Sequence, residues 1–545
     1  MSILNTSNAN LLGRKNNIRK LIELKVKQHG DKPFLIFKPK DGGEEILTYR
    51  QFDDQVNRLA NWYLSKGIDK GDCVMVHLPN SPGFAIAASA CLKIGAIMIP
   101  SIIFDVADDL EYKLSFSETK MVVTEEQFYG EFEKALKKCP TVKDVLIYRS
   151  EKPIKNTHVW NEVIDNSSPD LKEVEIDSMD IAQMMFTSGT TARPKGVLHT
   201  HANMLYIGDV CMRSFSVRPE DRYILVLPLF HVNAQCISWY PCLTAGASMV
   251  LCEVFSASKY MEMVRQYDVT ICSHVAATAL MVLNQPEHPL DGESKMWRCP
   301  YAISISDEEW NEFERRFNTT LIDLYGLTET LAPCTIMPIW GEHRRGSVGF
   351  PNAGMEVKII DDERKNEMPI GEVGEIAIKG EPGISLFKEY YKNPEATAKE
   401  LVDNWFYSGD YGKVDEEGYV YFVDRKKDVI QRGGENIAAA EVERVLNDHE
   451  EIAECAVIPV PDPIRDEAVM AIIHLTAGSK MTEKDILEYC KPRMAKFKLP
   501  TFIKITKEEF PKTSIGKIKK NEMKGEIHET WDFEKELKSI KEKIK

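Results

Sequence analysis

The sequence predicts an α/β protein with three parts: a large doubly wound domain, a β-rich segment and a small α+β domain. Apolar strands alternate with amphipathic helices up to about residue 345, short strands separated by turns follow to about 424, and a new mixed pattern begins at 425. A chain of 545 residues is too long for a single core. We therefore expect an N-terminal domain at 1–424, with its β-rich part at about 345–424, and a C-terminal domain at 425–545.

The first strand–helix–strand repeat lies between residues 49 and 101. The segment "YRQFDDQVNRLANWYLSKGI" carries a helical apolar stripe that closes at Lys66 and Gly67. A continuous apolar strand, "CVMVHL", follows, and "FAIAASACLKIGAIMIP" predicts a buried helix, a turn at Gly95 and a buried strand. This order predicts a parallel, doubly wound sheet. The stripe consists of Phe52, Val56, Leu59, Ala60, Tyr63 and Leu64.

Later segments continue the pattern and then change it. Further strands are expected in "RYILVLPL", "GASMVLCE" and "DVTICSHV". The stretch "GMEVKIIDDERKNEMPIGEVGEIAIKGE" has short strands between turns, which favours an antiparallel sheet or barrel. In the C-terminal part we expect helices in "AAAEVERVLNDH" and "EKDILEYCKPRM" and strands in "ECAVIPVPD" and "AVMAIIHL".

Composition excludes several classes of protein. The net charge of −15 argues against a nucleic-acid binder, which would present a basic surface. The 12 cysteines are scattered without a CxxC pair, so their spacing indicates neither a zinc site nor a redox motif and is typical of the reducing cytosol. The N-terminal "MSILNTSNANLLGRKNN" lacks the apolar core of a signal peptide, and Lys93 and Pro100 interrupt the most apolar stretch. We expect a cytoplasmic protein without a membrane span.

The stretch "FTSGTTARPKG" at 186–196 lies between two strand-like segments and is rich in small and hydroxylic residues. Successive backbone N–H groups in such a bend form a concave anion site, and Lys195 adds a positive charge beside it. The stretch is not a Walker A motif, in which the lysine follows glycine and precedes Ser or Thr. It predicts a phosphate-binding loop.

Four further motifs accompany this loop: "DLYGLTET" at 323–330, "YSGDYG" at 407–412, "DRKKDVIQRGGENI" at 424–437 and "PKTSIGKI" at 511–518. In this order the set resembles the adenylate-forming superfamily of acyl-CoA synthetases, adenylation domains and luciferases, from about residue 30 to 520. The segments "LFKEYYKNPEATAK", "IRDEA" and "MAKFKLP" are most similar to the crotonobetaine/carnitine–CoA ligases within it. At 302–306 the chain reads "AISIS" where most relatives have a glycine-rich turn that contacts adenine and the acyl group.

This resemblance implies an α/β fold with a large N-terminal domain of doubly wound mixed sheets, a small β-barrel-like subdomain and a small mobile C-terminal α+β domain. It implies an ATP- and Mg²⁺-dependent acid–CoA ligase that forms an acyl-adenylate and then an acyl-CoA thioester, with coenzyme A as co-substrate. The expected partners are a small-molecule carboxylic acid, ATP and CoA, with no nucleic acid and no membrane span. The oligomeric state stays open, with a homodimer as one option.

The resemblance also assigns roles to residues of the large domain. Glu329 would bind Mg²⁺ and His231 would close the acyl pocket. Tyr325 would stack on adenine, Asp323 would accept from its amino group, and Thr328 would contact the α-phosphate, with Gly326 in the same motif. The β- and γ-phosphates would be held by Thr187, Ser188, Gly189, Thr190, Thr191 and Lys195.

Other roles fall near and beyond residue 407. Asp410 would accept both ribose hydroxyls, and Arg425 would add a ribose or phosphate contact. Lys427 would be the hinge between two closed poses, and Gly433 and Gly434 would line the pantetheine tunnel. Lys517 would bridge the acyl carboxylate and the α-phosphate and neutralise charge in the transition state.

The identity of the acid is less directly indicated. A betaine has no hydrogen to donate from its quaternary ammonium, so its recognition needs aromatic faces or a carboxylate, and Phe230, Trp239 and Tyr240 follow the pocket motif. The first hypothesis is that the protein is a ligase for carnitine, crotonobetaine or γ-butyrobetaine. The alternatives are a medium-chain fatty or aryl acid–CoA ligase, an adenylation protein that loads a carrier domain, and a non-catalytic nucleotide-binding relative.

Overall fold

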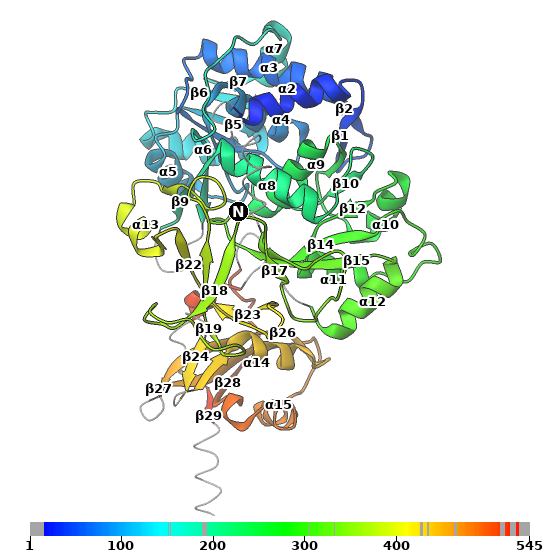
Figure 1. The fold of residues 1–545 in the computed structure, drawn as a ribbon, viewed down its shortest axis with the longest axis vertical. Coiled ribbons are helices and arrows are strands. Elements are labelled where there is room, and N and C mark those ends of the chain that lie inside the picture. The colour runs from blue at the N-terminus through cyan, green and yellow to red at the C-terminus, as the bar shows by residue number, and fades with distance from the viewer. Residues whose placement is uncertain are drawn as a thin grey trace, which may run out of the picture. The chain divides into compact units, whose positions relative to one another are not determined.

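The computed structural model divides the chain into two units (Figure 1). The first unit is Met1–Val357 with Ile378–Phe406, and the second is Lys358–Ala377 with Tyr407–Lys545. The division expected at 424/425 therefore stays a prediction. The structure describes residues 16–150, 152, 154–187, 193–302, 305–331, 333–425, 429–432, 435–462, 466–512, 518–523 and 530–532.

One mixed sheet of the first unit has strands mainly from the N-terminal part of the chain. Its strands are parallel from β8 to β7, whereas β9 pairs antiparallel with β8 and β20 antiparallel with β9. The order is β20 (Glu389–Tyr390), β9 (Lys195–Thr200), β8 (Ile181–Thr187), β4 (Ile97–Pro100), β3 (Cys73–His77), β5 (Met121–Glu125), β6 (Asp144–Tyr148) and β7 (His158–Val159).

The second mixed sheet of this unit is also mainly parallel, with antiparallel strands at both ends. Its order is β17 (Phe350–Pro351), β16 (Pro333–Ile336), β15 (Thr320–Gly326), β14 (Arg298–Ala302), β12 (Ile271–Cys272), β10 (Arg222–Leu225), β11 (Ser248–Cys252), β1 (Pro33–Lys38) and β2 (Glu45–Thr48), and β13 (His274–Val275) pairs with β14. The predicted doubly wound α/β fold with mixed sheets is confirmed.

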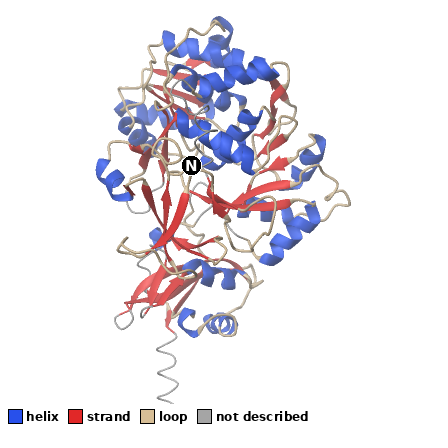
Figure 2. Cartoon of the chain, viewed as in Figure 1, coloured by secondary structure: helices blue, strands red, loops and turns tan. Residues whose placement is uncertain are grey.

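Helices alternate with these strands (Figure 2). They are α2 (Ile18–His29), α3 (Tyr49–Ser65), α4 (Pro82–Ile94), α5 (Ala107–Phe116), α6 (Glu126–Ala135), α7 (Trp160–Asn166), α8 (His201–Ser214), α9 (Tyr240–Ala245), α10 (Ala257–Gln266), α11 (Ala276–Leu283), α12 (Asp307–Phe317) and α13 (Pro394–Glu400). A π-helical segment, Ala234–Trp239, precedes α9. In Figure 1, α2, α3 and α4 lie together.

Local sequence accounts for the first predicted repeat. Helix α3 begins at a capping box formed by Thr48 and Gln51 and buries its predicted stripe, except that Leu64 is only half-buried. Helix α4 begins where the Ser81 hydroxyl accepts from the Phe84 N–H, and it ends at Gly95, whose φ of 73° suits a residue without a Cβ. Every residue of α4 is buried, as expected for a helix that is apolar all round.

A buried arginine anchors strand β14. Arg298 is 1% exposed, and its guanidinium lies 2.6 Å from Asp221 and donates to the carbonyl oxygens of Phe215 and Ser216 at 2.6 Å each. Removing one partner of a buried ion pair costs about 3–5 kcal/mol, because the other charge is left uncompensated. The pair therefore holds the strand that leads into residues 302–306.

The β-rich segment forms a small sheet ordered β18 (Glu356–Ile360), β19 (Gly374–Lys379), β22 (Trp405–Val414) and β21 (Leu401–Val402), with β23 (Val420–Arg425) antiparallel to β22. The C-terminal sheet is ordered β25 (Glu435–Ala438), β24 (Val429–Arg432), β27 (Asp466–Leu475), β28 (Phe502–Thr506) and β29 (Trp531–Asp532), and β26 (Ile452–Asp462) pairs with β27. Helices α14 (Ala439–Asn447) and α15 (Glu483–Cys490) accompany it.

Two elements differ from the sequence prediction. Helix α15 ends at Cys490 and not at Met494, because Pro492 has no backbone N–H with which to continue the helical hydrogen bonds. The strand expected in "DVTICSHV" is divided into β12 and β13 on either side of Ser273. Among the described residues, no helix combines the length and the apolar character that crossing a membrane requires.

Candidate functional site

The predicted phosphate loop connects two antiparallel strands, as the flanking sequences indicate. Strand β8 ends at Thr187 and β9 begins at Lys195, and these two residues face each other in the strand register. The loop residues Ser188, Gly189, Thr190 and Thr191 lie outside the described residues. Their expected contacts with phosphate stay predictions.

Lys195 is held by two side chains of the segment 389–400. Its Nζ lies 2.8 Å from Oε1 of Glu400, on the last residue of α13. The same ammonium lies over the ring of Tyr390, 4.1 Å from its centroid. An ammonium over an aromatic face is attracted by the ring quadrupole, so both neighbours orient the lysine side chain.

Tyr390 connects Glu400, the ion-pair partner of Lys195, to Glu329. Its hydroxyl lies 2.8 Å from Oε1 of Glu329 and 2.6 Å from Oε2 of Glu400. Because a phenol has one proton to donate, the two carboxylates share it. Lys195, Tyr390, Glu329 and Glu400, here called the lysine–carboxylate cluster, thus form one connected polar group.

Glu329 is the buried carboxylate of this cluster, with 8% exposure. Burial raises its pKa, whereas the hydrogen bond from Tyr390 and the charge of Lys195 lower it. Its backbone oxygen accepts from the Phe387 N–H at 2.7 Å. A carboxylate oxygen in this position is the ligand type that Mg²⁺ prefers, and a cation there would stabilise the ionised form that burial disfavours.

The turn that carries Glu329 is also fixed from β9. Nε2 of His199 lies 2.8 Å from the carbonyl oxygen of Thr328, so that nitrogen carries the proton and donates. Burial lowers the pKa of His199 to about 4, so the ring is neutral at physiological pH. The Thr328 side chain is half-buried and Gly326 is exposed at the end of β15.

Asp323, on β15, has an unusual buried carboxyl group. It is 2% exposed, and its Oδ1 accepts from the Leu324 N–H at 2.8 Å. Oδ2 is buried and has no hydrogen-bond partner among the described residues. Burial raises the pKa of Asp323 to about 8, although the Leu324 N–H opposes this shift. An orphaned acceptor of this kind fits a ligand N–H donor, such as an amino group of adenine.

Tyr325 lies two residues further along the same strand. It is 8% exposed, and its backbone pairs with Thr335 of β16. Cys334 donates its thiol hydrogen to the Tyr325 carbonyl oxygen, with 3.3 Å between the heavy atoms. The expected stacking of this ring on adenine stays a prediction.

The role expected for His231, which is to close the acyl pocket, stays a prediction. Burial lowers its pKa to about 4, so the ring is neutral at physiological pH. Its Nε2 is buried without a partner in the described part of the chain, and the Phe230 ring lies 4.7 Å away, centroid to centroid. Trp239 and Tyr240 are each 1% exposed and stack on each other at 5.8 Å with an interplanar angle of 7°.

The remaining predicted residues belong to the second unit. Asp410 is buried on β22 and lies opposite Arg425 of β23, which is exposed. Lys427, Gly433, Gly434 and Lys517 lie outside the described residues. The roles expected for these six residues stay predictions.

Sequence reasoning missed two members of the lysine–carboxylate cluster, Tyr390 and Glu400. Both lie in "YYKNPEATAKE", about 200 residues after the phosphate loop, and the sequence around them carries no sign of the contact. It also missed a cluster of Cys272, His274 and Cys299 in the second sheet. The C-x-H spacing of the first two places them on one face of a strand, which is the only local signal.

Comparisons with known proteins show the family to which the chain belongs. Residues 22–391 match the AMP-binding enzyme family, and residues 441–517 match the AMP-binding enzyme C-terminal domain. Crotonobetaine/carnitine–CoA ligases of Salmonella heidelberg and of Citrobacter koseri are each 35% identical to the chain over 512 residues, which cover 93% of this chain and 99% of theirs.

Solved structures show the same fold. The anthranilate CoA ligase AuaEII in complex with anthranoyl-AMP superposes with a TM-score of 0.86 at 25% identity, covering 94% of this chain and 98% of that one. ATP-bound MatB from Rhodopseudomonas palustris superposes with a TM-score of 0.82 at 25% identity, covering 93% and 98%. A fatty acyl CoA synthetase of Mycobacterium tuberculosis has a TM-score of 0.71 at 27% identity, covering 94% and 98%.

Proposed function

The chain belongs to the family of AMP-binding enzymes and is an AMP-forming acid–CoA ligase, and from this premise we propose that its acid substrate is a trimethylammonium acid: carnitine, crotonobetaine or γ-butyrobetaine. The observation that carries the proposal is the 35% identity, over nearly the full length of both chains, to ligases named for crotonobetaine and carnitine.

The ligase reaction uses ATP, Mg²⁺ and CoA in two steps. The acid carboxylate attacks the α-phosphate of ATP, which forms an acyl-adenylate and releases pyrophosphate. The CoA thiol then attacks the acyl carbon, which forms the thioester and releases AMP. The protein has to bring two anions together in the first step, so fixed positive charge and hydrogen-bond donors at the phosphates lower the barrier.

The lysine–carboxylate cluster supplies such a charge. Lys195 provides the ammonium for the β- and γ-phosphates, next to the loop that begins after Thr187. Glu400 competes with phosphate for that ammonium, because its carboxylate lies 2.8 Å from Nζ. The phenol of Tyr390 favours the ionised form of Glu329 by hydrogen bonding to it.

Glu329 is the residue that would hold Mg²⁺, since it is the buried carboxylate of the cluster and offers oxygen ligands. When bound, the ion neutralises phosphate charge. Asp323 would accept a hydrogen bond from the adenine amino group through Oδ2, and neutral His231 would close the acid pocket without exchanging a proton.

A trimethylammonium group demands a particular pocket. Having no N–H, it is recognised by aromatic faces and by negative charge, at about 0.5–2 kcal/mol for each aromatic contact. Phe230 lies next to His231 at the position expected for the pocket. It is therefore the first aromatic candidate for that contact.

A second candidate function is the activation of an uncharged medium-chain or aryl acid by the same two steps. Trp239 and Tyr240 favour it, because they stack on each other and are almost fully buried, which is typical of an apolar lining. The anthranilate and fatty acyl ligases among the solved structures act on such acids by their names.

A panel of acids distinguishes the two functions. The full-length enzyme would be supplied with ATP, Mg²⁺ and CoA, and formation of the CoA ester would be measured with crotonobetaine, carnitine, γ-butyrobetaine, hexanoate and benzoate. We expect the highest kcat/KM with one of the three betaines. A kcat/KM for hexanoate or benzoate far above all three would refute the betaine proposal and leave the ligase activity in place.

A further inference from the structure

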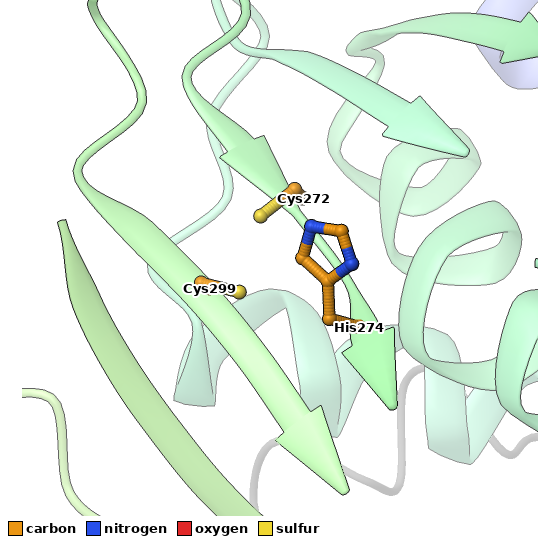
Figure 3. A group of neighbouring side chains, drawn as sticks. All are labelled: Cys272, His274 and Cys299. Carbon is orange, nitrogen blue, oxygen red and sulfur yellow. The ribbon is translucent and has the colours of Figure 1, made fainter. Parts of the chain in front are cut away.

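Three potential metal ligands meet inside the second sheet of the first unit (Figure 3). Cys272 ends β12, His274 begins β13 and Cys299 lies on β14. The parallel register pairs Ile271 with Arg298 and His274 with Tyr301, so Cys272 and Cys299 lie opposite each other on neighbouring strands. Although Ser273 separates the two strands, the His274 ring lies on the same side as the two sulfur atoms (Figure 3).

The distances suit a small ion. The two sulfur atoms and one nitrogen of the His274 ring all lie within 4.8 Å of one another. Donor atoms around a tetrahedral zinc ion lie roughly 3.3–3.8 Å apart, given Zn–S and Zn–N bonds of about 2.3 and 2.0 Å. Each donor would therefore move inwards by about 1 Å or less, which side-chain rotation can provide.

The hydrogen bonds of Thr278 fix which nitrogen of His274 is available. The Thr278 hydroxyl donates its proton to the Val275 carbonyl oxygen at 3.0 Å and lies 3.0 Å from Nδ1 of His274. Since that single proton is used, Nδ1 carries the hydrogen and donates to the hydroxyl oxygen. Nε2 then has a free lone pair, and it is buried with no partner among the residues described. This is the arrangement in which a histidine binds a metal and a second group orients its ring.

The surroundings are dry and apolar. Cys272, His274 and Cys299 are all 0% exposed, and the rings of Tyr260 and Phe313 lie 4.9 and 6.0 Å from the His274 ring. Although burial acts against it, the neighbouring Cys299 and His274 side chains lower the pKa of the Cys272 thiol. Burial and the Cys272 side chain raise the pKa of the Cys299 thiol.

We propose that Cys272, Cys299 and Nε2 of His274 supply three of the ligands of a zinc ion that joins the neighbouring strands. With both thiols deprotonated in the bound state, Zn²⁺ and two thiolates give a site without net charge, and neutral His274 keeps its Nδ1 hydrogen. Charge neutrality favours a divalent over a monovalent ion, since a leftover charge in a dry interior is costly. Two thiolates favour zinc over Mg²⁺ or Ca²⁺, which take oxygen ligands.

The position of the site gives the ion a structural role. It would join β12, β13 and β14, and β14 pairs with β15 so that Tyr301 lies opposite Asp323. Strand β14 also leads to residues 302–306. Zinc would thus stabilise the strands beside Asp323, whose carboxyl group we propose to contact adenine. The ion would take no part in the ligase chemistry.

The test uses the untagged full-length chain, kept reduced. After zinc is added and free metal is removed by dialysis, we expect about one zinc per chain by elemental analysis. Cobalt(II) alone, added to chelator-treated protein, should give the near-ultraviolet band of thiolate-to-cobalt charge transfer. Cys272→Ser and Cys299→Ser should each lower the zinc content severalfold and lose the cobalt band.

Cys252→Ser is the matched control, because Cys252 is a buried thiol on β11 of the same sheet and lies outside the cluster. It should keep both the zinc and the band. The proposal is overturned if the wild-type chain shows no thiolate band with cobalt, a result that does not depend on whether any variant folds. It is equally overturned if folded Cys272→Ser and Cys299→Ser proteins retain wild-type zinc.

Discussion

Lys195 and Glu400 form an ion pair, with 2.8 Å between Nζ and Oε1, although 205 residues separate them along the chain. The two side chains are 29% and 27% exposed, so water and salt weaken the pair. Lys195 is therefore held in place by a contact that phosphate oxygens can replace. The Tyr390 phenol extends this relationship to Glu329, so the four groups form one hydrogen-bonded and ion-paired network.

Replacing Glu400 with glutamine tests that competition. Glu400→Gln keeps a hydrogen-bonding group near Tyr390 but removes the charge that attracts Lys195. A partly exposed ion pair is worth about 0.2–1 kcal/mol, so we expect the KM for ATP to fall about two- to fivefold with little change in kcat. Glu395→Gln, an exposed change on the same helix, is the control. A KM that rises tenfold would mean that Glu400 helps to hold the nucleotide.

Tyr390→Phe tests the shared phenol. The lost hydrogen bond favoured the ionised form of Glu329, so its pKa should rise further and a higher pH should be needed to ionise it. Hydrogen bonds to charged groups contribute about 1.5–3 kcal/mol, so we expect an apparent Mg²⁺ affinity about tenfold weaker and an acid limb of the pH–rate profile moved to higher pH. Tyr391→Phe is the matched control. An unchanged Mg²⁺ dependence would contradict the assignment of Glu329.

The proposed contact between Asp323 and adenine predicts that ATP binding depends on pH. The pKa of Asp323, about 8, lies above the ordinary 3.8, so between these pH values the folded protein holds a proton that the unfolded chain has lost. The Asp323 carboxyl therefore destabilises the fold progressively as pH rises through this range. An amino group of adenine donates best to the ionised carboxylate. The preference for ATP over ITP, which has a carbonyl oxygen at that position, should therefore increase as pH rises through about 8.

Asp323→Asn separates this effect from general changes with pH. The substituted amide would use its oxygen for the Leu324 N–H and present its NH₂ where Oδ2 lies, so a donor would face the adenine amino group. At about pH 9 the ratio of kcat/KM for ATP and ITP should fall about tenfold or more and lose its pH dependence. A ratio unaffected by the substitution would show that Asp323 does not contact the base.

Lys517→Ala tests the residue assigned to the first step. We expect acid-dependent exchange between pyrophosphate and ATP to fall about 100-fold or more, since a charge aimed at the transition state is lost, while thioester formation from supplied acyl-adenylate survives. Equal loss of both steps in Lys517→Ala would give that lysine a structural role.

Gly434→Leu should slow thioester formation and spare pyrophosphate–ATP exchange, because a bulky side chain would block the tunnel for pantetheine.

Local patterns were sufficient for much of the fold. Helix α3 was predicted by its stripe and α4 by its apolar run and the turn at Gly95, because both signals lie within one element. The flanking strands of the phosphate loop were predicted for the same reason. The break at Ser273 was not, since "TICSHV" has the composition of one continuous strand.

Contacts between distant segments were beyond such patterns. Glu400 is the last residue of an ordinary helix sequence, and only the folded chain brings it to Lys195. Cys272 and Cys299 lie in separate segments of the chain and meet because β12 and β14 are neighbours, so a search for CxxC pairs could not find them. The motifs assigned to nucleotide binding could be recognised because each of them lies within one short stretch of sequence.

The most direct measurement of the substrate proposal compares two acids of the same shape. In the carbon isostere of γ-butyrobetaine, a tert-butyl group replaces the trimethylammonium group, so only the charge differs. We predict that kcat/KM is about 30-fold or more higher with γ-butyrobetaine, since a desolvated cation over an aromatic face is worth about 2 kcal/mol or more. An isostere that reacts as fast as the betaine, or faster, would contradict recognition of the cation and favour an uncharged acid as the substrate.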